Sequence, residues 1–191
     1  MFDLTWEEKL SFLVDQDHQM KDILLSKGIY SDTYHSELQK VHLNNAKKLI
    51  EMIEKMGFPV LSNAGDRGVR LSWLIIHHAI SMPNFMKESL LEMRMAAGQN
   101  DYILELLAYT EDRVAYLEGR QQLFGTNTEW IDGELKRTPI EDLSKVDLRR
   151  KAVGLPPLAS TPILSSMERP PRDPVIKAKE FQEWLVKVGW R

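Results

Sequence analysis

The sequence contains no cysteine, and this absence removes several kinds of chemistry together. Disulfides, thiolate metal ligands and cysteine nucleophiles are all excluded. A chain without cysteine suits a reducing compartment. Its first residues, "MFDLTWEEKL", are acidic and amphipathic, unlike the basic start and apolar core of a signal peptide. We therefore expect a soluble protein of the cytoplasm.

The chain also lacks a long apolar run and an excess of basic residues. No stretch approaches the roughly 18 apolar residues that a membrane-spanning helix needs. The formal net charge is -3, whereas nucleic-acid-binding domains usually carry a basic excess. We expect neither a membrane nor a nucleic acid among the partners.

Familiar catalytic signatures are missing as well. The sequence has no Walker phosphate loop, no HExxH zinc motif and no GxSxG nucleophile elbow. His77 and His78 are adjacent on a predicted helix, so their side chains point about 100° apart and cannot grip one ion from that helix alone. We expect no metal and no cofactor, and one of the two histidines facing the core or a pocket.

What the sequence does have is a recurring helical period. Apolar residues return every three to four positions, and glycine or proline ends most of these runs. The Thr5–Glu8 pair is a capping box before the first run. Helices are predicted over 6–27, 36–56, 67–80, 83–97, 100–118, 144–153 and 174–188.

Residues 120–143 interrupt this pattern. They carry no helical period, and Asp132-Gly133 is typical of a tight hairpin turn. We predict an all-α protein: a single helical domain of about five to six helices over 1–158, with a polar loop or small hairpin. A Pro/Ser-rich linker over 159–172 then leads to an amphipathic helix over 173–191.

Polar residues that could form a site gather around the fifth helix and the loop after it. Asp112 and Arg113 lie on the helix, and the loop adds glycines and amides that suit a neutral polar or mixed ligand. Arg149 and Arg150 lie in a short helix, where they could bind an anion or complement the helix dipole. The residues expected to contact a ligand are Arg113, Gln122, Gly125, Thr126, Asn127, Arg149 and Arg150.

Three segments together resemble an uncharacterised, mainly bacterial protein family: "GFPVLSNAGDRGVRLSWLIIHHA", "LAYTEDRVAYLEGRQQLFGT" and "PIEDLSKVDLRRKAVGLPPL". That family has Gly-Trp-Pro, Gln-His-Ala-Asp and Asp-Arg motifs, a Gly-x-x-Gln-x-Tyr-Gly-Thr-Gln loop and a final Arg-Arg…Gly-Leu-x-Pro-Leu. The resemblance covers about residues 10–158, in order and with matching spacing. It implies a shared fold and site without naming an activity.

The resemblance places individual residues on these motifs. His78 falls on the motif histidine, and Asp112 and Arg113 fall on the Asp-Arg pair. Asp15-Gln16 matches an acidic position near the N-terminus. The departures are His77, Ile80, Phe124 and Asn127, where the family has glutamine, aspartate, tyrosine and glutamine. Ile80 removes a carboxylate and Phe124 a hydroxyl. If either group does chemistry in relatives, this chain would bind a ligand without turning it over.

Two functions follow from these patterns. In the first, the protein binds a small polar or anionic molecule, with His78 as general base, Asp112 orienting it and Arg113 stabilising negative charge. Hydrolytic or other acid/base chemistry would fit, and the sequence leaves open whether the protein is an enzyme. In the second, it is a non-catalytic interaction or scaffold protein, and the same residues hold the fold together. Its C-terminal helix would then bind a protein partner through Phe181, Trp184, Leu185 and Trp190.

Overall fold

The computed structural model describes residues 5–30, 34–131, 134–163 and 170–191. The chain is all-α, apart from one small two-stranded sheet. The helices are α1 (Trp6–Ser26), α2 (Ser36–Met56), α3 (Leu61–His78), α4 (Pro83–Gly98), α5 (Leu104–Leu117), α6 (Val146–Ala152) and α7 (Pro174–Val188). The strands are β1 (Thr128–Ile131) and β2 (Glu134–Arg137), and two short 3-10 helices cover Leu143–Lys145 and Leu158–Ser160. None of the described helices is long and apolar enough to cross a membrane.

The chain divides into two compact units. The first combines Met1–Ile23 with His35–Leu107, and the second combines Leu24–Tyr34 with Ala108–Arg191. The C-terminal helix α7 belongs to the second unit. Residues 164–169 of the predicted linker lie outside the described residues.

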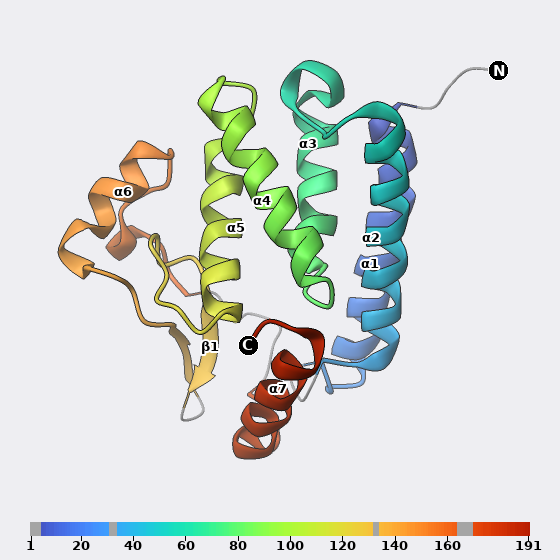
Figure 1. The fold of residues 1–191 in the computed structure, drawn as a ribbon. Helices are drawn as coiled ribbons and strands as arrows, with labels where there is room; N and C mark the ends of the chain where they lie inside the picture. Colours follow the sequence, from blue (N-terminus) through green and yellow to red (C-terminus); the bar gives the residue numbers. More distant parts are fainter. Residues whose placement is uncertain (1–4, 31–33, 132–133, 164–169) are drawn as a thin grey trace. The chain divides into compact units, whose positions relative to one another are not determined.

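The first unit is built on α1, α2, α3 and α4 (Figure 1). Its core consists of residues that recur at helical spacing on these helices, among them Leu10, Leu49, Val69 and Met93, each fully buried. Gly68 allows α3 to approach α1 closely, because a Cβ at this position would lie 3.1 Å from the Cβ of Trp6. Burying each such leucine stabilises the fold by about 1.5–3 kcal/mol, so this core is the main source of stability in the unit.

The start of α3 differs from the sequence prediction. Residues 61–66 were expected to be a connection, yet helical backbone begins at Leu61 and is interrupted only at Gly65, where φ is 66°. The side chain of Asn63 accepts a hydrogen bond from the backbone N–H of Val60 at 2.9 Å, and Asp101 accepts one from the N–H of Ser62 at 2.8 Å. These bonds satisfy N–H groups that would otherwise be unpaired at the helix start. Gly65 then adopts a left-handed conformation that other residues resist.

The second unit holds the β-hairpin, α6 and α7. The two strands pair antiparallel, with Trp130 opposite Leu135. The predicted turn, Asp132-Gly133, lies outside the described residues. Asp173 caps α7 by accepting a hydrogen bond from the N–H of Ile176 at 2.9 Å.

Aromatic side chains hold α7 within the second unit. Phe181 stacks on Tyr116 with 6.1 Å between ring centroids, and Trp184 meets Tyr34 edge to face at 5.2 Å. Leu185 and Trp190 are 0 % and 4 % exposed. Leu185 and Trp190 are thus buried in this unit, while Phe181 and Trp184 are partly buried against its rings.

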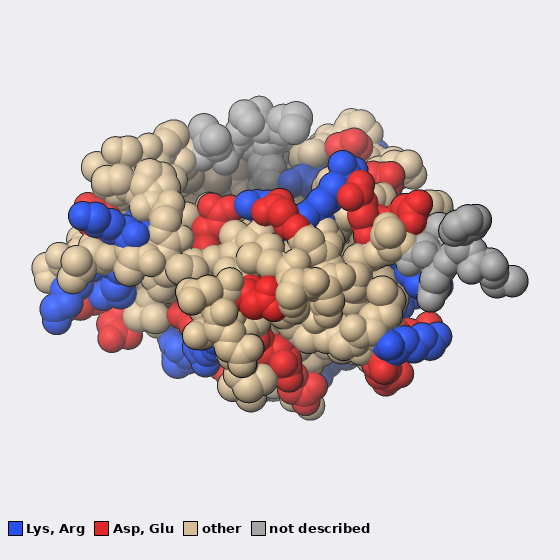
Figure 2. Space-filling model, turned by 90° about the horizontal axis from the view of Figure 1, so that it is seen from above, with Lys and Arg blue, Asp and Glu red and all other residues tan. Residues whose placement is uncertain are grey.

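Charged side chains of both signs are interspersed on the face seen in Figure 2. Exposed charged side chains also form ion pairs. On α3, Arg70 bonds to Asp66 one turn earlier and also to Glu105, each at 2.9 Å, with all three side chains well exposed. Such exposed pairs contribute little to stability, typically less than about 1 kcal/mol.

Candidate functional site

The most unusual polar arrangement in the first unit is a cluster of three side chains, Asp17, His42 and His78, hereafter the Asp–His–His cluster. They come from α1, α2 and the last residue of α3. The Asp17 carboxylate contacts His42 Nε2 through Oδ1 at 3.0 Å and His78 Nδ1 through Oδ2 at 2.5 Å. One carboxylate therefore bridges two imidazoles.

Helix periodicity brings these residues to the core. Asp17 continues the stripe of Leu10, Leu13 and Val14 along the buried face of α1, and it is only 4 % exposed. His42 shares the buried face of α2 with Leu38 and is 7 % exposed. A charged or polar residue at such positions must find a partner, because burying it alone costs several kcal/mol. The cluster supplies that partner on both sides.

Electrostatics favour the ionised form of Asp17. Burial alone would raise the pKa of its carboxyl, but the hydrogen bonds and charges of His42 and His78 together outweigh burial. The net result is that the pKa of Asp17 lies well below its usual range. Asp17 is therefore a carboxylate at neutral pH, positioned to orient both imidazole rings.

The cluster is closed on one side and accessible on the other. The side chain of His78 is 28 % exposed, while those of Asp17 and His42 are 6 % and 8 % exposed. The rings of His42 and His78 lie 4.9 Å apart and are tilted by 32°. His78 is thus the member of the cluster that a small molecule can reach directly.

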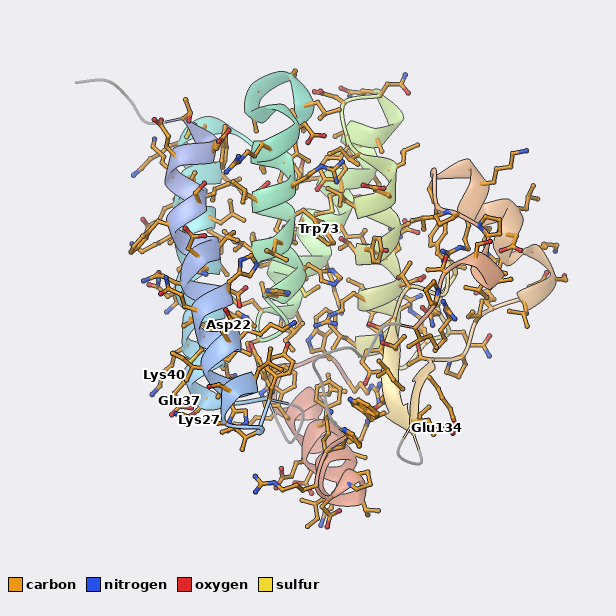
Figure 3. The ribbon with its side chains drawn as sticks, turned by 180° about the vertical axis from the view of Figure 1, so that it is seen from behind. Asp22, Lys27, Glu37, Lys40, Trp73 and Glu134 are labelled. Atoms are coloured by element: carbon orange, nitrogen blue, oxygen red, sulfur yellow. The ribbon has the colours of Figure 1, made fainter. Side chains whose placement is uncertain are left out.

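Aromatic packing surrounds this end of α3. Trp73, labelled on α3 in Figure 3, lies with its ring centroid 4.9 Å from that of His77. Its indole N–H donates to the carbonyl of Leu106 at 3.1 Å. Of the two adjacent histidines, His78 joins the cluster and His77 packs against this tryptophan.

The same three side chains offer donor atoms that could hold a metal ion, all within 4.8 Å of one another. Two imidazoles and a carboxylate are ligands that zinc or ferrous iron accepts. However, bond lengths of about 2.0–2.1 Å place two ligands of a tetrahedral zinc about 3.3 Å apart. The contact of 2.5 Å between His78 and Asp17 is a hydrogen-bond distance, and each imidazole uses a different carboxylate oxygen. The observed contacts are hydrogen bonds between two imidazoles and one carboxylate.

Asp112, which was expected to orient His78, has other partners. It lies in the second unit, is fully buried, and accepts hydrogen bonds from the backbone N–H groups of Leu123, Phe124 and Thr126 and from the Thr126 hydroxyl, at 2.7–3.2 Å. Its carboxylate thus organises the loop after α5. The carboxylate that contacts His78 is Asp17.

The side-chain amide of Gln122 bonds within the loop and to Thr138, the residue after β2. Gln122 donates to the carbonyls of Asn127 and Thr138 at 3.0 and 2.7 Å, and accepts from the Asn127 N–H at 2.8 Å. Gly125 has a φ of 71°, and a Cβ there would lie 2.8 Å from side-chain atoms of both Ile140 and Leu158. Glycine is therefore required by backbone shape and by close packing.

The two arginines of α6 also bond to the loop. Arg149 donates to the carbonyls of Leu123, Glu141 and Asp142. Arg150 is 2 % exposed and donates to the carbonyls of Phe124 and Pro156, each at 2.6 Å, and to the Thr161 hydroxyl. Both side chains act as clamps on backbone oxygens, a geometry that the planar guanidinium suits.

Three of the four residues expected to depart from the family's motifs are buried. Ile80 is 7 % exposed in the first unit. Phe124 is 8 % exposed and packs with Ala108 and Leu155 in the second. Asn127 is 8 % exposed, and its Nδ2 has no hydrogen-bond partner among the described residues. Ile80 and Phe124 are both apolar, and Phe124 lies in an apolar cluster.

The sequence predicted only one member of the Asp–His–His cluster, His78. The N-terminal acidic residue was expected to be Asp15, which is exposed, while Asp17 points inward. A signal for Asp17 and His42 was present: each interrupts an apolar stripe at a buried position of an amphipathic helix. Such an interruption on two helices indicates side chains that meet inside.

Taken together, these observations define an all-α protein whose first unit presents a carboxylate-bridged pair of histidines and whose second unit holds a polar loop clamped by arginines. The chain belongs to the family of unknown function DUF6624, whose model matches residues 14–165. No curated protein and no solved structure matches the chain.

Proposed function

We propose that this protein binds a small polar molecule at the Asp–His–His cluster and exchanges a proton with it. The observation that carries the proposal is the buried Asp17 carboxylate bridging two imidazoles, one of which is partly exposed. Histidine is the side chain best suited to proton transfer near neutral pH. A carboxylate bonded to one ring nitrogen fixes the tautomer and stabilises the imidazolium that forms during the transfer.

In this proposal each residue has a distinct role. His78 is the general base that touches the substrate. Asp17 is the positioning residue, which holds the His78 ring and balances its charge. His42 buries the second carboxylate oxygen, so that Asp17 remains ionised and fixed in orientation. The reaction class that such a group serves best is hydrolysis or another acid/base step. We also propose that the protein is bacterial and is located in the cytoplasm.

Ester hydrolysis provides a direct test. The wild-type protein should hydrolyse p-nitrophenyl acetate faster than buffer, and His78→Ala and Asp17→Asn should each reduce the protein-dependent rate by at least about tenfold, since general base catalysis contributes roughly 10²–10⁴-fold. The matched control is His18→Ala, which removes an exposed histidine of α1 outside the cluster and should leave the rate unchanged.

Two results would overturn this proposal. One is an equal rate for wild-type protein and a folded His78→Ala variant. The other is a rate that appears only with an added divalent ion and disappears with a chelator, because the three side chains would then serve as metal ligands. Circular dichroism of each variant establishes that it is folded.

A second candidate is supported by the hydrogen bonds of the loop. Asp112, Gln122, Thr126, Arg149 and Arg150 bond to one another's backbone or to nearby segments of the second unit. A network satisfied in this way is typical of residues that hold a fold together. On this view the protein is a scaffold or interaction protein, and loss of any of these residues should reduce stability without altering a binding or catalytic readout.

A further inference from the structure

Arg113 differs from the other arginines of the second unit. Its Nε is buried and has no hydrogen-bond partner among the described residues. By contrast, Arg137, Arg150 and Arg191 each donate to a backbone carbonyl within the unit. The same α5 helix therefore carries a fully bonded carboxylate at 112 and, beside it, a guanidinium with an unused donor.

The surroundings of Arg113 are aromatic. Tyr30, Tyr34 and Tyr116 all lie close enough to affect the pKa of Arg113. Tyr116 stacks with Phe181, Phe181 stacks with Trp184 at 5.7 Å, and Trp184 meets Tyr34. These rings form a continuous aromatic wall, which comprises Tyr34, Tyr116, Phe181 and Trp184.

No carboxylate of the described residues balances the charge of Arg113. Burial is the main influence and lowers the pKa of Arg113, and the groups that oppose it are tyrosines. Arginine does not give up its proton in proteins, so the group stays cationic. Burial also raises the pKa of Tyr116, so this phenol is neutral, and Glu129 is hydrogen-bonded to it. An unbalanced buried cation is costly, and an anion that arrives from outside would remove that cost.

We propose that Arg113 and the aromatic wall form a binding site for the carboxylate of a small aromatic acid. A guanidinium recognises a carboxylate through two parallel hydrogen bonds, which would use the Nε that is now unpaired. The flat body of the acid would lie against the rings, as aromatic groups prefer stacked or edge-on contacts. Arg113 as a whole is partly exposed whereas its Nε is buried, so a ligand would approach from the exposed part of the residue. This site is separate from the proposed acid/base function, because it uses none of the three residues of the Asp–His–His cluster.

The first test is an NMR titration of arginine-labelled wild-type protein. The Nε–Hε resonance of Arg113 should shift and saturate with sodium benzoate, and should show no saturable shift with sodium chloride at the same ionic strength. Inorganic phosphate forms the comparison arm: a weaker response than benzoate is expected, because phosphate cannot use the aromatic wall. A phosphate response equal to or stronger than that of benzoate would overturn the aromatic-acid assignment. Identical shifts that do not saturate in any of the three salts would mean that the ions only screen the charge of Arg113. That result would refute the proposed binding site.

The second test compares Arg113→Met with Arg120→Met, a control that removes an exposed arginine just after the same helix. Benzoate should raise the melting temperature of wild-type protein and Arg120→Met but not of Arg113→Met. An equal rise in Arg113→Met would refute the proposal, and if that variant does not fold, the titration of wild-type protein decides. His78→Ala should keep the full benzoate response, which separates failure of this site from failure of the acid/base proposal.

Discussion

Replacing Asp17 by Asn tests the Asp–His–His cluster most directly, because the side chain keeps its shape and loses its charge. The carboxylate accepts two hydrogen bonds from imidazoles, and an amide has one oxygen to replace two. A hydrogen bond to a buried charged group contributes about 1.5–3 kcal/mol. We therefore expect Asp17→Asn to lower the free energy of unfolding at pH 7 by about 2–3 kcal/mol.

The pH dependence of that loss follows from the direction of the Asp17 pKa. The folded state holds the pKa of Asp17 below its value in the unfolded chain, about 3.9. The stability gained from the charge is therefore present in full above that pH and is lost as pH falls through the lower folded pKa. The difference between wild-type protein and Asp17→Asn should shrink on acidification below about pH 4.

Urea denaturation at pH 7, 5, 4 and 3, monitored by far-ultraviolet circular dichroism, measures the loss of stability at pH 7 and its change with pH. Asp15→Asn, which alters an exposed carboxylate two residues away, is the control and should change stability by less than about 0.5 kcal/mol at every pH. An Asp17→Asn variant as stable as wild type at pH 7 would refute the reasoning. So would a loss of stability that stays constant down to pH 3.

Three further predictions concern the second unit. Asp112→Asn should lower the free energy of unfolding by about 3–5 kcal/mol in urea denaturation, because loop N–H groups lose a buried charged acceptor. Asp66→Asn on the surface is the control and should change it by less than about 0.5 kcal/mol. Similar losses in the two variants would contradict the role assigned to Asp112. Gly125→Ala should cost more than about 1 kcal/mol by thermal denaturation, since φ is positive and the new Cβ clashes, while Gly98→Ala, with open space around it, should be neutral or stabilising. Arg150→Lys should lose at least about 2 kcal/mol, because an ammonium cannot reproduce three bonds in the plane of a guanidinium; a Lys variant of wild-type stability would show that charge alone is sufficient.

Most of the helices could be predicted from the sequence because local signals mark both ends. Thr5 and Glu8 bond reciprocally at the start of α1, and Pro83 begins α4. These devices act over three or four residues, so they are visible in the sequence. The start of α3 was missed, and part of it depends on Asp101, which is 39 residues away from its partner Ser62.

The site was less predictable for the same reason. Asp17 lies 25 residues from His42 and 61 from His78, so only the packing of three helices brings them together. Asp112 and His78 were expected to be partners because the resemblance placed both on motifs of the family. The partners of Asp112 are loop N–H groups 11 to 14 residues further along, which carry no side-chain signal because they belong to the backbone.

The way in which Asp112 holds the loop has a consequence for local motion. Three amide protons, those of Leu123, Phe124 and Thr126, depend on a single carboxylate. If one of these hydrogen bonds breaks, the Asp112 carboxylate moves and the other two hydrogen bonds weaken. The carbonyls of Leu123 and Phe124 also accept hydrogen bonds from arginines of α6. The loop should therefore open as one unit, and the three amides should exchange with deuterium at a common rate set by that opening.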